Sequence, residues 1–451
     1  IIMSKITENG LNHKKNSKLH LTELTQKRKV HLTLFVQYGK VDLAILRRCQ
    51  MLDELRSIHN DTVSSYDQKK RRYIESQINW ENQCICLSGP RGVGKTTLLI
   101  QHYLEKYGSP ELCLYISGDN INVVSNGIYN IVREHFKYGG KAIIIDEIHK
   151  YPNWAQELKN SIDTYKNGKF IISGSSSLDL IKAKYDLSRR VVYYNMKGFS
   201  FREYLSFAEG IDLPVLDLNE ILKNHSSIST GICSKTKILK HFDEYMTHGY
   251  YPFILEGKDE YFQKVLNCIE KVLYEDIAVI FNLTQPKLPI LKKMLWLIST
   301  SNPFVPNIAG MSRDLGISKE YVYSYLEFLE TAGILNSVNE NTEGAKLVRK
   351  AGKIYFENPN IPVAINGAIK KETLTGMMRE TFFLNQLNLL HKVSLHKQCD
   401  FLVDDTFSFE IGGPSKKTAQ IREINDGLIA MDGIETGYGR KIPLYLFGFL
   451  Y

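Results

Sequence analysis

The sequence predicts an α/β fold, with a parallel β-sheet in its first folded domain and a second α/β domain at its C-terminal end. Between residues 82 and 195, short apolar runs alternate with amphipathic segments of helical period. A glycine-rich turn follows the first apolar run, and a later run ends in two acidic residues. Because strands that alternate with helices form parallel sheets covered on both faces, these observations predict a sheet between two layers of helices.

Composition supports a folded protein of several domains. The chain has 451 residues, of which 43% are hydrophobic and 24% charged. These values exclude collagen-like, low-complexity and wholly disordered proteins. The seven cysteines are scattered without a paired CxxC, which favours reduced packing residues over a zinc site. No apolar run approaches the roughly 18 residues that cross a bilayer, and no signal-peptide pattern is present, so we expect a cytoplasmic protein without membrane association.

The positive charge is concentrated at the N-terminal end. The net charge is +8, and residues 1–50 contain 10 Lys and Arg against 3 acidic residues, a charge of +7 that leaves +1 for the other 401 residues. Met51 then opens a helical pattern. We therefore expect residues 1–50 to be a basic tail, disordered or non-native. The nearly neutral remainder gives no electrostatic argument for DNA binding.

Five strands and the helices between them define the first domain, which we place at residues 51–205. The strands are expected at Gln83–Leu87, Leu112–Ile116, Ala142–Ile145, Phe170–Ile172 and Val191–Tyr194. Among the helices, Asn153–Tyr165 repeats apolar residues at every fourth position.

The turn after the first strand carries the pattern of a phosphate-binding loop. Its residues fit GxxxxGK[ST], the Walker A pattern, and are Gly89, Pro90, Arg91, Gly92, Val93, Gly94, Lys95 and Thr96, followed by a helical run from Thr97. Glycines let backbone N–H groups converge on phosphate oxygens, and the next helix directs its positive end there. Lys95 would hold the β- and γ-phosphates of ATP, and the Thr96 hydroxyl would ligate Mg²⁺.

Acidic and polar residues follow two later strands. Asp146 and Glu147 end the run Ala142–Ile145, which places their carboxylates at the ligand-binding edge of the sheet in a Walker B arrangement. Asp146 would hold Mg²⁺ through water, and Glu147 would polarise the attacking water. Because a GTPase more often has Gly after the Asp, this pair favours ATP. Ser173 or Ser175 after the next strand could contact the γ-phosphate or the water.

Two arginines, Arg189 and Arg190, precede the last strand of this domain. Either could reach transition-state charge, within the subunit or from a neighbour. A solvated arginine pair is the alternative.

The ordered series GPRGVGKTT, IIIDEIHKYPNW, FIISGSSS, SRRVVYYNMKGFSFREYL and HGYYPF resembles a family of prokaryotic AAA-type ATPases. That family carries a C-terminal domain of unknown function with a winged helix and a nuclease-like end. The resemblance runs from about Met51 to Tyr451 and implies an ATPase core that uses Lys95, Thr96, Asp146 and Glu147 as above. It also implies Ser173 or Ser175 as the first sensor and Arg190 as the family-like arginine. His149 stands where the family commonly has Gln.

Downstream of the ATPase core, the sequence predicts a helical region at 206–300 and a winged-helix module at 301–355. Two helices between Asn307 and Gly333 are expected to hinge at Gly316. The second, Lys319 to Glu330, has one cation against three acidic residues, so its face would repel a phosphate backbone. DNA binding, to which Arg349, Lys350 and Lys353 could contribute, is therefore not favoured over packing between domains or against a protein partner.

Residues 356–451 are expected to form a restriction-endonuclease-like α/β domain without nuclease activity. The predicted order is helix, three strands, helix and strand, with Glu380 on the helix, Asp400 starting a strand and Glu410 on the next. Such a site needs a lysine two residues after the last carboxylate, where this chain has Gly412. Lys416 and Lys417 lie past Pro414, where strand geometry no longer directs them at Glu410. A lysine from elsewhere could rescue the site, and three unrelated surface acids are the other interpretation.

Together these observations favour a slow Mg²⁺-dependent ATPase that acts as a nucleotide-controlled switch. A DNA- or protein-binding regulator with nucleotide as a structural ligand, and an ATP-dependent nuclease, are the alternatives. The partner and the oligomeric state do not follow from the sequence.

Overall fold

The structure is a computed structural model and describes residues 43–66, 69–174, 187, 189–278, 281, 283, 285–301, 305–340, 352–414, 424 and 427–451. The chain divides into two compact units, Ile1–Ile58 and His59–Tyr451. The described residues of the first unit belong to helix α2 (Leu43–Ser64). The expectation that the helix opens at Met51 is wrong, because the preceding segment LAILRRCQ consists mostly of good helix formers. The finer division of the chain into five parts stays a prediction.

The second unit begins with the predicted parallel sheet. Its strands are β1 (Cys84–Ser88), β2 (Cys113–Ser117), β3 (Ala142–Asp146), β4 (Lys169–Gly174) and β5 (Val192–Asn195). Their order is β2-β3-β4-β1-β5, and every neighbouring pair is parallel. The predicted α/β fold class is confirmed, with each strand shifted by only one or two residues. The carboxyl ends of β1, β3 and β4 lie side by side, which brings the segments that follow them to one edge.

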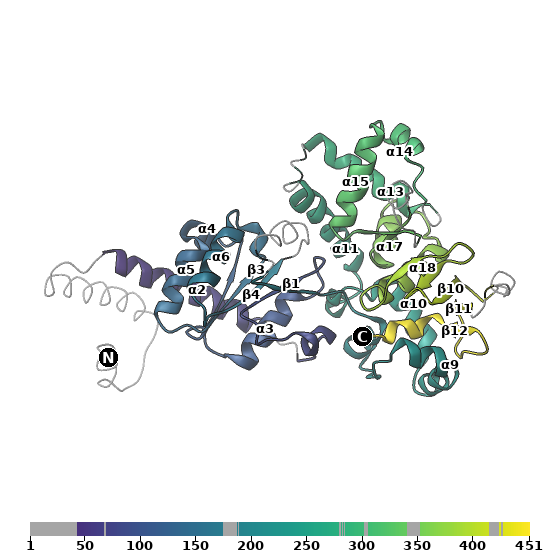
Figure 1. The fold of residues 1–451 in the computed structure, drawn as a ribbon, viewed down its shortest axis with the longest axis horizontal. Coiled ribbons are helices and arrows are strands. Elements are labelled where there is room, and N and C mark those ends of the chain that lie inside the picture. The colour runs from purple at the N-terminus through teal and green to yellow at the C-terminus, as the bar shows by residue number, and fades with distance from the viewer. Residues whose placement is uncertain are drawn as a thin grey trace. The chain divides into compact units, whose positions relative to one another are not determined.

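Helices cover both faces of this sheet. They are η2 (Tyr73–Gln77), α3 (Lys95–Lys106), α4 (Ile121–Asn126), α5 (Ile128–Lys137), η3 (Ile148–Lys150) and α6 (Trp154–Thr164). The chain steps outward from β1 to β2 and then back through β3 to β4, so right-handed crossovers put α3 on one face and α5 and α6 on the other. Figure 1 shows this separation.

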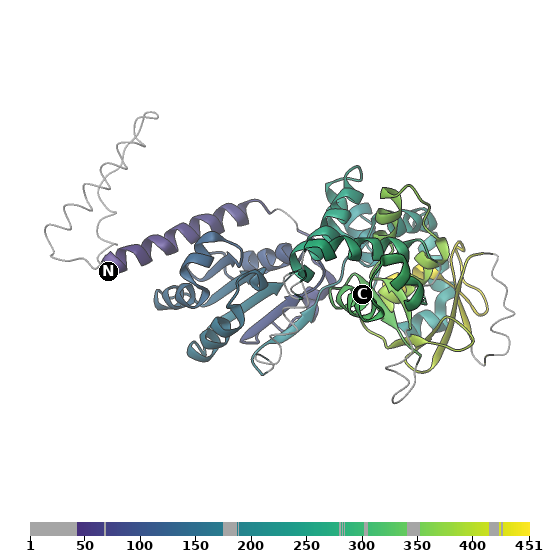
Figure 2. The ribbon, with the colours of Figure 1, turned by 90° about the horizontal axis from the view of Figure 1, so that it is seen from above.

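A helical region follows the sheet, drawn in teal to green in Figures 1 and 2. Its elements are α8 (Phe201–Glu209), α9 (Leu218–Cys233), α10 (Ile238–His248), η4 (Pro252–Glu256), α11 (Tyr261–Lys271), the π-helix η5 (Val272–Ile277), η6 (Gln285–Lys287) and α13 (Leu288–Ser299). A capping box at Ser200 and Glu203 starts α8.

Two helices and a strand pair occupy the predicted winged-helix segment. They are α14 (Ile308–Leu315), α15 (Lys319–Thr331), and the antiparallel strands β6 (Leu335–Val338) and β7 (Lys353–Phe356). Gly316 ends α14 in the left-handed conformation, as the predicted hinge requires. Residues 341–351, which include Arg349 and Lys350, lie outside the described residues. The winged-helix interpretation therefore stays a prediction.

A second sheet lies in the C-terminal part of the chain. After α17 (Asn360–Ala368) and α18 (Thr375–Leu387) come β8 (Val393–Leu395), β9 (Phe401–Val403), β10 (Phe407–Gly412), β11 (Leu428–Met431), β12 (Lys441–Pro443) and η8 (Leu444–Phe449). Its order is β12-β11-β10-β9-β8, antiparallel from β8 to β10 and parallel from β10 to β12. Two strands end the domain where one was predicted. The helix predicted between β10 and β11 stays a prediction, because only residue 424 is described between residues 414 and 427, and Lys416 and Lys417 also lie outside the described residues.

In the part of the chain that the structure describes, no helix has both the length and the apolar character needed to cross a bilayer.

Candidate functional site

The predicted phosphate-binding loop connects β1 to α3 in the geometry that its glycines require. Gly89, Gly92 and Gly94 have φ angles of 148°, 81° and 92°, which residues other than glycine rarely adopt. At Gly89 a Cβ atom would lie 2.2 Å from the backbone oxygen of Met196. Glycine is therefore needed at this position both for its backbone conformation and for the close approach of a neighbouring chain segment.

Lys95 forms hydrogen bonds with the backbone of its own loop. Its buried ammonium group donates hydrogen bonds to the backbone oxygens of Gly89 and Pro90, each at 2.8 Å. Burial lowers the pKa of Lys95, and the charges of Glu147 and Asp146 oppose that shift. The ammonium group therefore lies at the centre of the loop, where a phosphate oxygen could replace the two carbonyl oxygens.

Asp146 receives hydrogen bonds at both carboxylate oxygens. Oδ2 accepts from the hydroxyls of Thr96 at 2.6 Å and Tyr115 at 2.9 Å. Oδ1 accepts from the Ser173 hydroxyl and from the Glu147 backbone N–H, the latter at 3.1 Å. Asp146 is only 3% exposed, and these donors satisfy its buried charge. The sheet thus brings together residues from the ends of β1, β3 and β4 that the sequence analysis placed in one site.

This arrangement fits a magnesium ion. Mg²⁺ is bound in proteins by a few oxygen ligands, with water and substrate phosphates completing the shell. The Thr96 hydroxyl and the Asp146 carboxylate are adjacent oxygen ligands of that kind. Among the described residues there is no cluster of three or more His, Cys, Asp or Glu side chains suited to a metal, so phosphates and water would have to supply the remaining ligands.

Glu147 has a strained backbone, with φ 49° and ψ 38° in the left-handed region. Gly118 allows the Glu147 backbone to approach closely, because a Cβ atom at position 118 would lie 2.5 Å from the Glu147 backbone oxygen. The Glu147 carboxylate lies 3.7 Å from the Lys150 ammonium and 3.8 Å from Nε2 of His149. Burial lowers the pKa of His149, so at neutral pH the nearby cation is Lys150.

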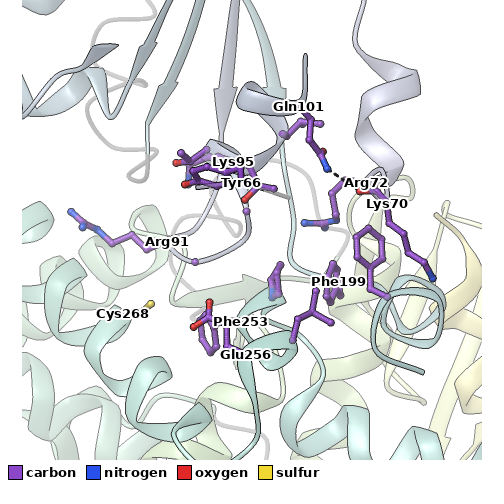
Figure 3. Close-up of a pocket in the computed structure, with 18 of the residues that line it drawn as sticks. Tyr66, Lys70, Arg72, Arg91, Lys95, Gln101, Phe199, Phe253, Glu256 and Cys268 are labelled. Carbon is purple, nitrogen blue, oxygen red and sulfur yellow. Dashed lines mark hydrogen bonds between the residues drawn. The ribbon is translucent and has the colours of Figure 1, made fainter. Parts of the chain in front are cut away.

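The loop lines a cavity of about 730 Å³, which is large enough for a nucleotide. The residues of the sheet domain that line it include Arg91, Gly92, Gly94, Lys95, Thr96, Thr97 and Glu147. The helical region contributes Phe253, Glu256 and Cys268 to the lining. Figure 3 shows Lys95 and Tyr66 facing Phe253 and Glu256 across this space. Of the other predicted loop residues, Val93 is fully buried and Pro90 contributes its carbonyl oxygen.

Arg190 does not reach this cavity within the chain. Its guanidinium binds Asp163 at 2.8 and 2.9 Å. Arg190 precedes β5, and with Arg189 it lines a hollow beside Cys84 at the start of β1. The phosphate loop follows the other end of β1, so the two arginines lie at the opposite edge of the sheet. The predicted contact within the subunit is therefore wrong. Ser175 lies outside the described residues.

The sequence analysis missed Arg72, which lines the cavity and binds the backbone of the phosphate loop. The Arg72 guanidinium donates to the backbone oxygens of Val93 at 2.6 Å and of Lys197 and Gly198 at 2.8 Å each. It also pairs with Glu203 at 2.9 Å, and both side chains are buried. Lys197 in turn pairs with Glu357 at 2.9 Å. A series of buried polar contacts therefore runs from the phosphate loop to the segment that follows β7.

Two of the three carboxylates predicted in the C-terminal domain lie beside a lysine. The Lys353 ammonium, from β7, lies 3.8 Å from Glu380 and 3.6 Å from Asp400. Glu380 also accepts a hydrogen bond from the Tyr355 hydroxyl at 2.8 Å. Glu410 is 4% exposed. Burial, followed by the charge of Asp400 and then by that of Glu410, raises the pKa of Glu380. The alternative of three unrelated surface acids is wrong for this cluster.

We expect no cleavage of linear, supercoiled or single-stranded DNA with Mg²⁺ or Mn²⁺, in the presence or absence of ATP. Lys353 is a lysine from elsewhere of the kind that could rescue the site, but its ammonium group pairs with both Glu380 and Asp400, and a divalent ion would have to displace it. Gel assays of purified protein test this. Cleavage that disappears in Asp400→Ala or Glu410→Ala would contradict it and favour an ATP-dependent nuclease.

Glu380→Gln is expected to change how stability depends on pH. Burial, followed by the charge of Asp400, raises the pKa of Glu380 from 4.5 to about 7. A carboxyl group with a raised folded-state pKa favours folding below its unfolded pKa, and this contribution is lost as the pH rises through the folded pKa. Between pH 4.5 and 7.5, the parent's unfolding free energy should therefore fall roughly 1–3 kcal/mol more than the variant's. Urea titrations at several pH values measure both, and identical pH profiles would contradict the expectation.

Comparison with known proteins locates two domains in the chain. Residues 81–205 match the family described as an AAA domain, and residues 239–372 match a domain of unknown function. An uncharacterized protein of Methanocaldococcus jannaschii is 29% identical over 329 residues, which cover 68% of each chain.

Two solved structures show low similarity. A Walker-type ATPase of Pyrococcus abyssi has 11% identity and a TM-score of 0.39, over 65% of this chain and 93% of that one. AMPPCP-bound DnaA from Aquifex aeolicus has 13% identity and a TM-score of 0.25, over 61% and 88%. The domain assignment rests on the family match together with the loop and sheet geometry. As the resemblance of the sequence implies, the chain carries an AAA-type P-loop domain and, after it, a domain of unknown function.

Proposed function

We propose that the protein binds ATP with Mg²⁺ in the cavity beside the phosphate loop and hydrolyses it slowly, as a nucleotide-controlled switch. The observation that carries the proposal is the contact of Thr96, Asp146 and Ser173 beside the loop lysine. Lys95 would hold the β- and γ-phosphates, and Thr96 and Asp146 would hold Mg²⁺, which neutralises charge on the phosphates. Glu147 would orient and polarise the attacking water.

The position of Arg190 supports the proposal that turnover is slow. A cation on the transferring phosphate accelerates hydrolysis by several orders of magnitude. Arg190 is paired with Asp163 at the far edge of the sheet, so within one chain it would not place a cation on the transferring phosphate. A neighbouring subunit could supply Arg190, so faster turnover in an oligomer would accord with the proposal.

A switch needs the nucleotide site to contact the rest of the chain. Arg91 joins the loop to η5, and Arg72 joins it to Lys197 and so to Glu357. Nucleotide that moves the loop would therefore disturb contacts in the helical region and beyond β7. The output is best explained by a protein partner, because Glu320, Glu327 and Glu330 on α15 are exposed and would repel DNA.

Steady-state turnover of purified protein tests the proposal. We expect release of phosphate from ATP that stops in EDTA and is slower with GTP. Tight ATP binding without turnover would instead favour a regulator that uses nucleotide as a structural ligand. Recovery of protein partners from the native host with and without ATP would identify what the switch controls.

A further inference from the structure

The one arginine in the phosphate loop, Arg91, is held by acidic residues from the helical region. Its Nε lies 3.1 Å from Oδ2 of Asp276, and one terminal nitrogen lies 2.7 Å from Oδ1 of the same carboxylate. That nitrogen is also 3.0 Å from Glu275. The side chains of Arg91 and Asp276 are 10% and 3% exposed, whereas that of Glu275 is 50% exposed. Asp276 is thus buried and forms a bidentate ion pair with Arg91 of the phosphate loop.

Asp276 lies in the π-helical turn η5, which continues directly from α11. A π-helical turn inserts an extra residue into a helix and often occurs at functional sites. Val272, Leu273 and Ile277 of this turn are buried in the apolar core, and the turn still directs the Asp276 carboxylate at the phosphate loop. The local backbone therefore serves the core and the loop contact together.

Asp276 also lies near the residues proposed for catalysis. Its Oδ1 is 3.9 Å from Nε2 of His149, which is 3.8 Å from the Glu147 carboxylate. The His149 side chain is 4% exposed. The negative charges of Glu147 and Asp276 both act on Lys95, where they oppose the lowering of its pKa by burial. Asp276 therefore contributes negative charge beside the place where the phosphates of ATP would bind.

The terminal phosphate of ATP and Asp276 would compete for one guanidinium. Arg91 lines the nucleotide cavity, and a guanidinium binds phosphate or carboxylate oxygens by the same two-pronged geometry. We propose that Asp276 is a positioning residue that holds Arg91 on the helical region in the nucleotide-free protein and releases it to the terminal phosphate of ATP. This inference rests on the proposed function, and it identifies η5 as the element of the helical region that responds to the γ-phosphate.

Equilibrium binding of ATP and ADP to Asp276→Asn tests the inference in the full-length protein. Removal of the competing charge should tighten ATP binding about 5- to 20-fold, within the usual range of coupling between sites, and tighten ADP binding much less. Glu275→Gln is the matched control, because Glu275 is half-exposed and makes one contact with Arg91. It should change the ATP-to-ADP affinity ratio less than about twofold.

A double-mutant cycle separates positioning from general destabilisation. In an Arg91→Ala background, Asp276→Asn should change the ATP-to-ADP affinity ratio less than about twofold, because only the weaker repulsion between the Asp276 charge and the phosphates remains to be removed. If Asp276→Asn folds poorly, Arg91→Ala alone serves instead, because it removes the guanidinium that would bind the terminal phosphate and should lower the ATP-to-ADP affinity ratio.

Equal effects on ATP and ADP, or an undiminished Asp276→Asn effect without Arg91, would overturn this inference while leaving ATP binding intact. A parent protein that shows no Lys95-dependent ATP binding would overturn the proposed function as well.

Discussion

Lys95→Ala is expected to weaken ATP binding by at least about 100-fold, since each hydrogen bond from a charged donor contributes about 1.5–3 kcal/mol. Within the described ranges of the chain, the buried Lys95 ammonium donates to two neutral acceptors, the backbone oxygens of Gly89 and Pro90. Phosphate oxygens would replace these neutral acceptors with charged ones. Alanine removes that gain and also leaves the two loop carbonyl oxygens without their donor.

Isothermal titration with ATP and Mg²⁺ measures the effect, and the thermal unfolding midpoint monitors the fold. Lys106→Ala is the matched control, because Lys106 ends the same helix and is exposed. It should bind ATP like the parent. A folded Lys95→Ala protein with parental affinity would exclude the phosphate loop as the nucleotide site.

The parallel sheet could be predicted from the sequence because β1 to β4 are buried on both faces, whereas the edge strand β5 is partly exposed. The residues before Ser88, Ser117 and Asp146 form nearly continuous apolar runs, which are typical of strands in a parallel sheet covered on both faces. The loop residues and Asp146 could be predicted for a related reason, since phosphate and Mg²⁺ chemistry fixes both their types and their positions after strands.

The residues that were missed come from elements far away in sequence. Arg72 and Asp276 are ordinary charged residues until the fold brings each to its partner. Lys353, which the sequence analysis considered only for DNA binding, is brought to Glu380 and Asp400 in the same way. Arg91 and Asp276, for example, are 185 residues apart. Tyr115 did carry a signal, because a hydroxyl in the buried strand β2 must find a partner, and that partner is Asp146.

The misplacement of Arg190 has a geometric cause. In a parallel sheet, residues that precede a strand and residues that follow one lie at opposite edges. Asp146 and Ser173 complete strands, whereas Arg190 comes before β5. The position of Arg190 relative to its strand was therefore sufficient to exclude contact with the phosphate loop of the same sheet, and only a second subunit could bring it there.

Glu147→Gln is expected to keep ATP binding and to lower the turnover number by about 100-fold or more, the range over which a positioned base contributes. Glutamine has nearly the same size and can adopt the left-handed backbone of Glu147 at a similar cost. The Glu147 backbone N–H can still donate to Asp146 and Ser173. Only the carboxylate that would take the proton from water is lost. Because a negative charge beside the phosphates is also removed, ATP binding should be equal or tighter.

Single-turnover hydrolysis of ATP, measured with protein in excess, separates the chemical step from binding and release. Glu105→Gln is a suitable control, because Glu105 lies on α3 and pairs at the surface with Arg71. If Glu147→Gln hydrolyses ATP at the parental rate, another group must activate the water. His149 would then be the nearest alternative, since its Nε2 lies 3.8 Å from the same carboxylate and burial lowers its pKa, which keeps the ring neutral and able to accept a proton.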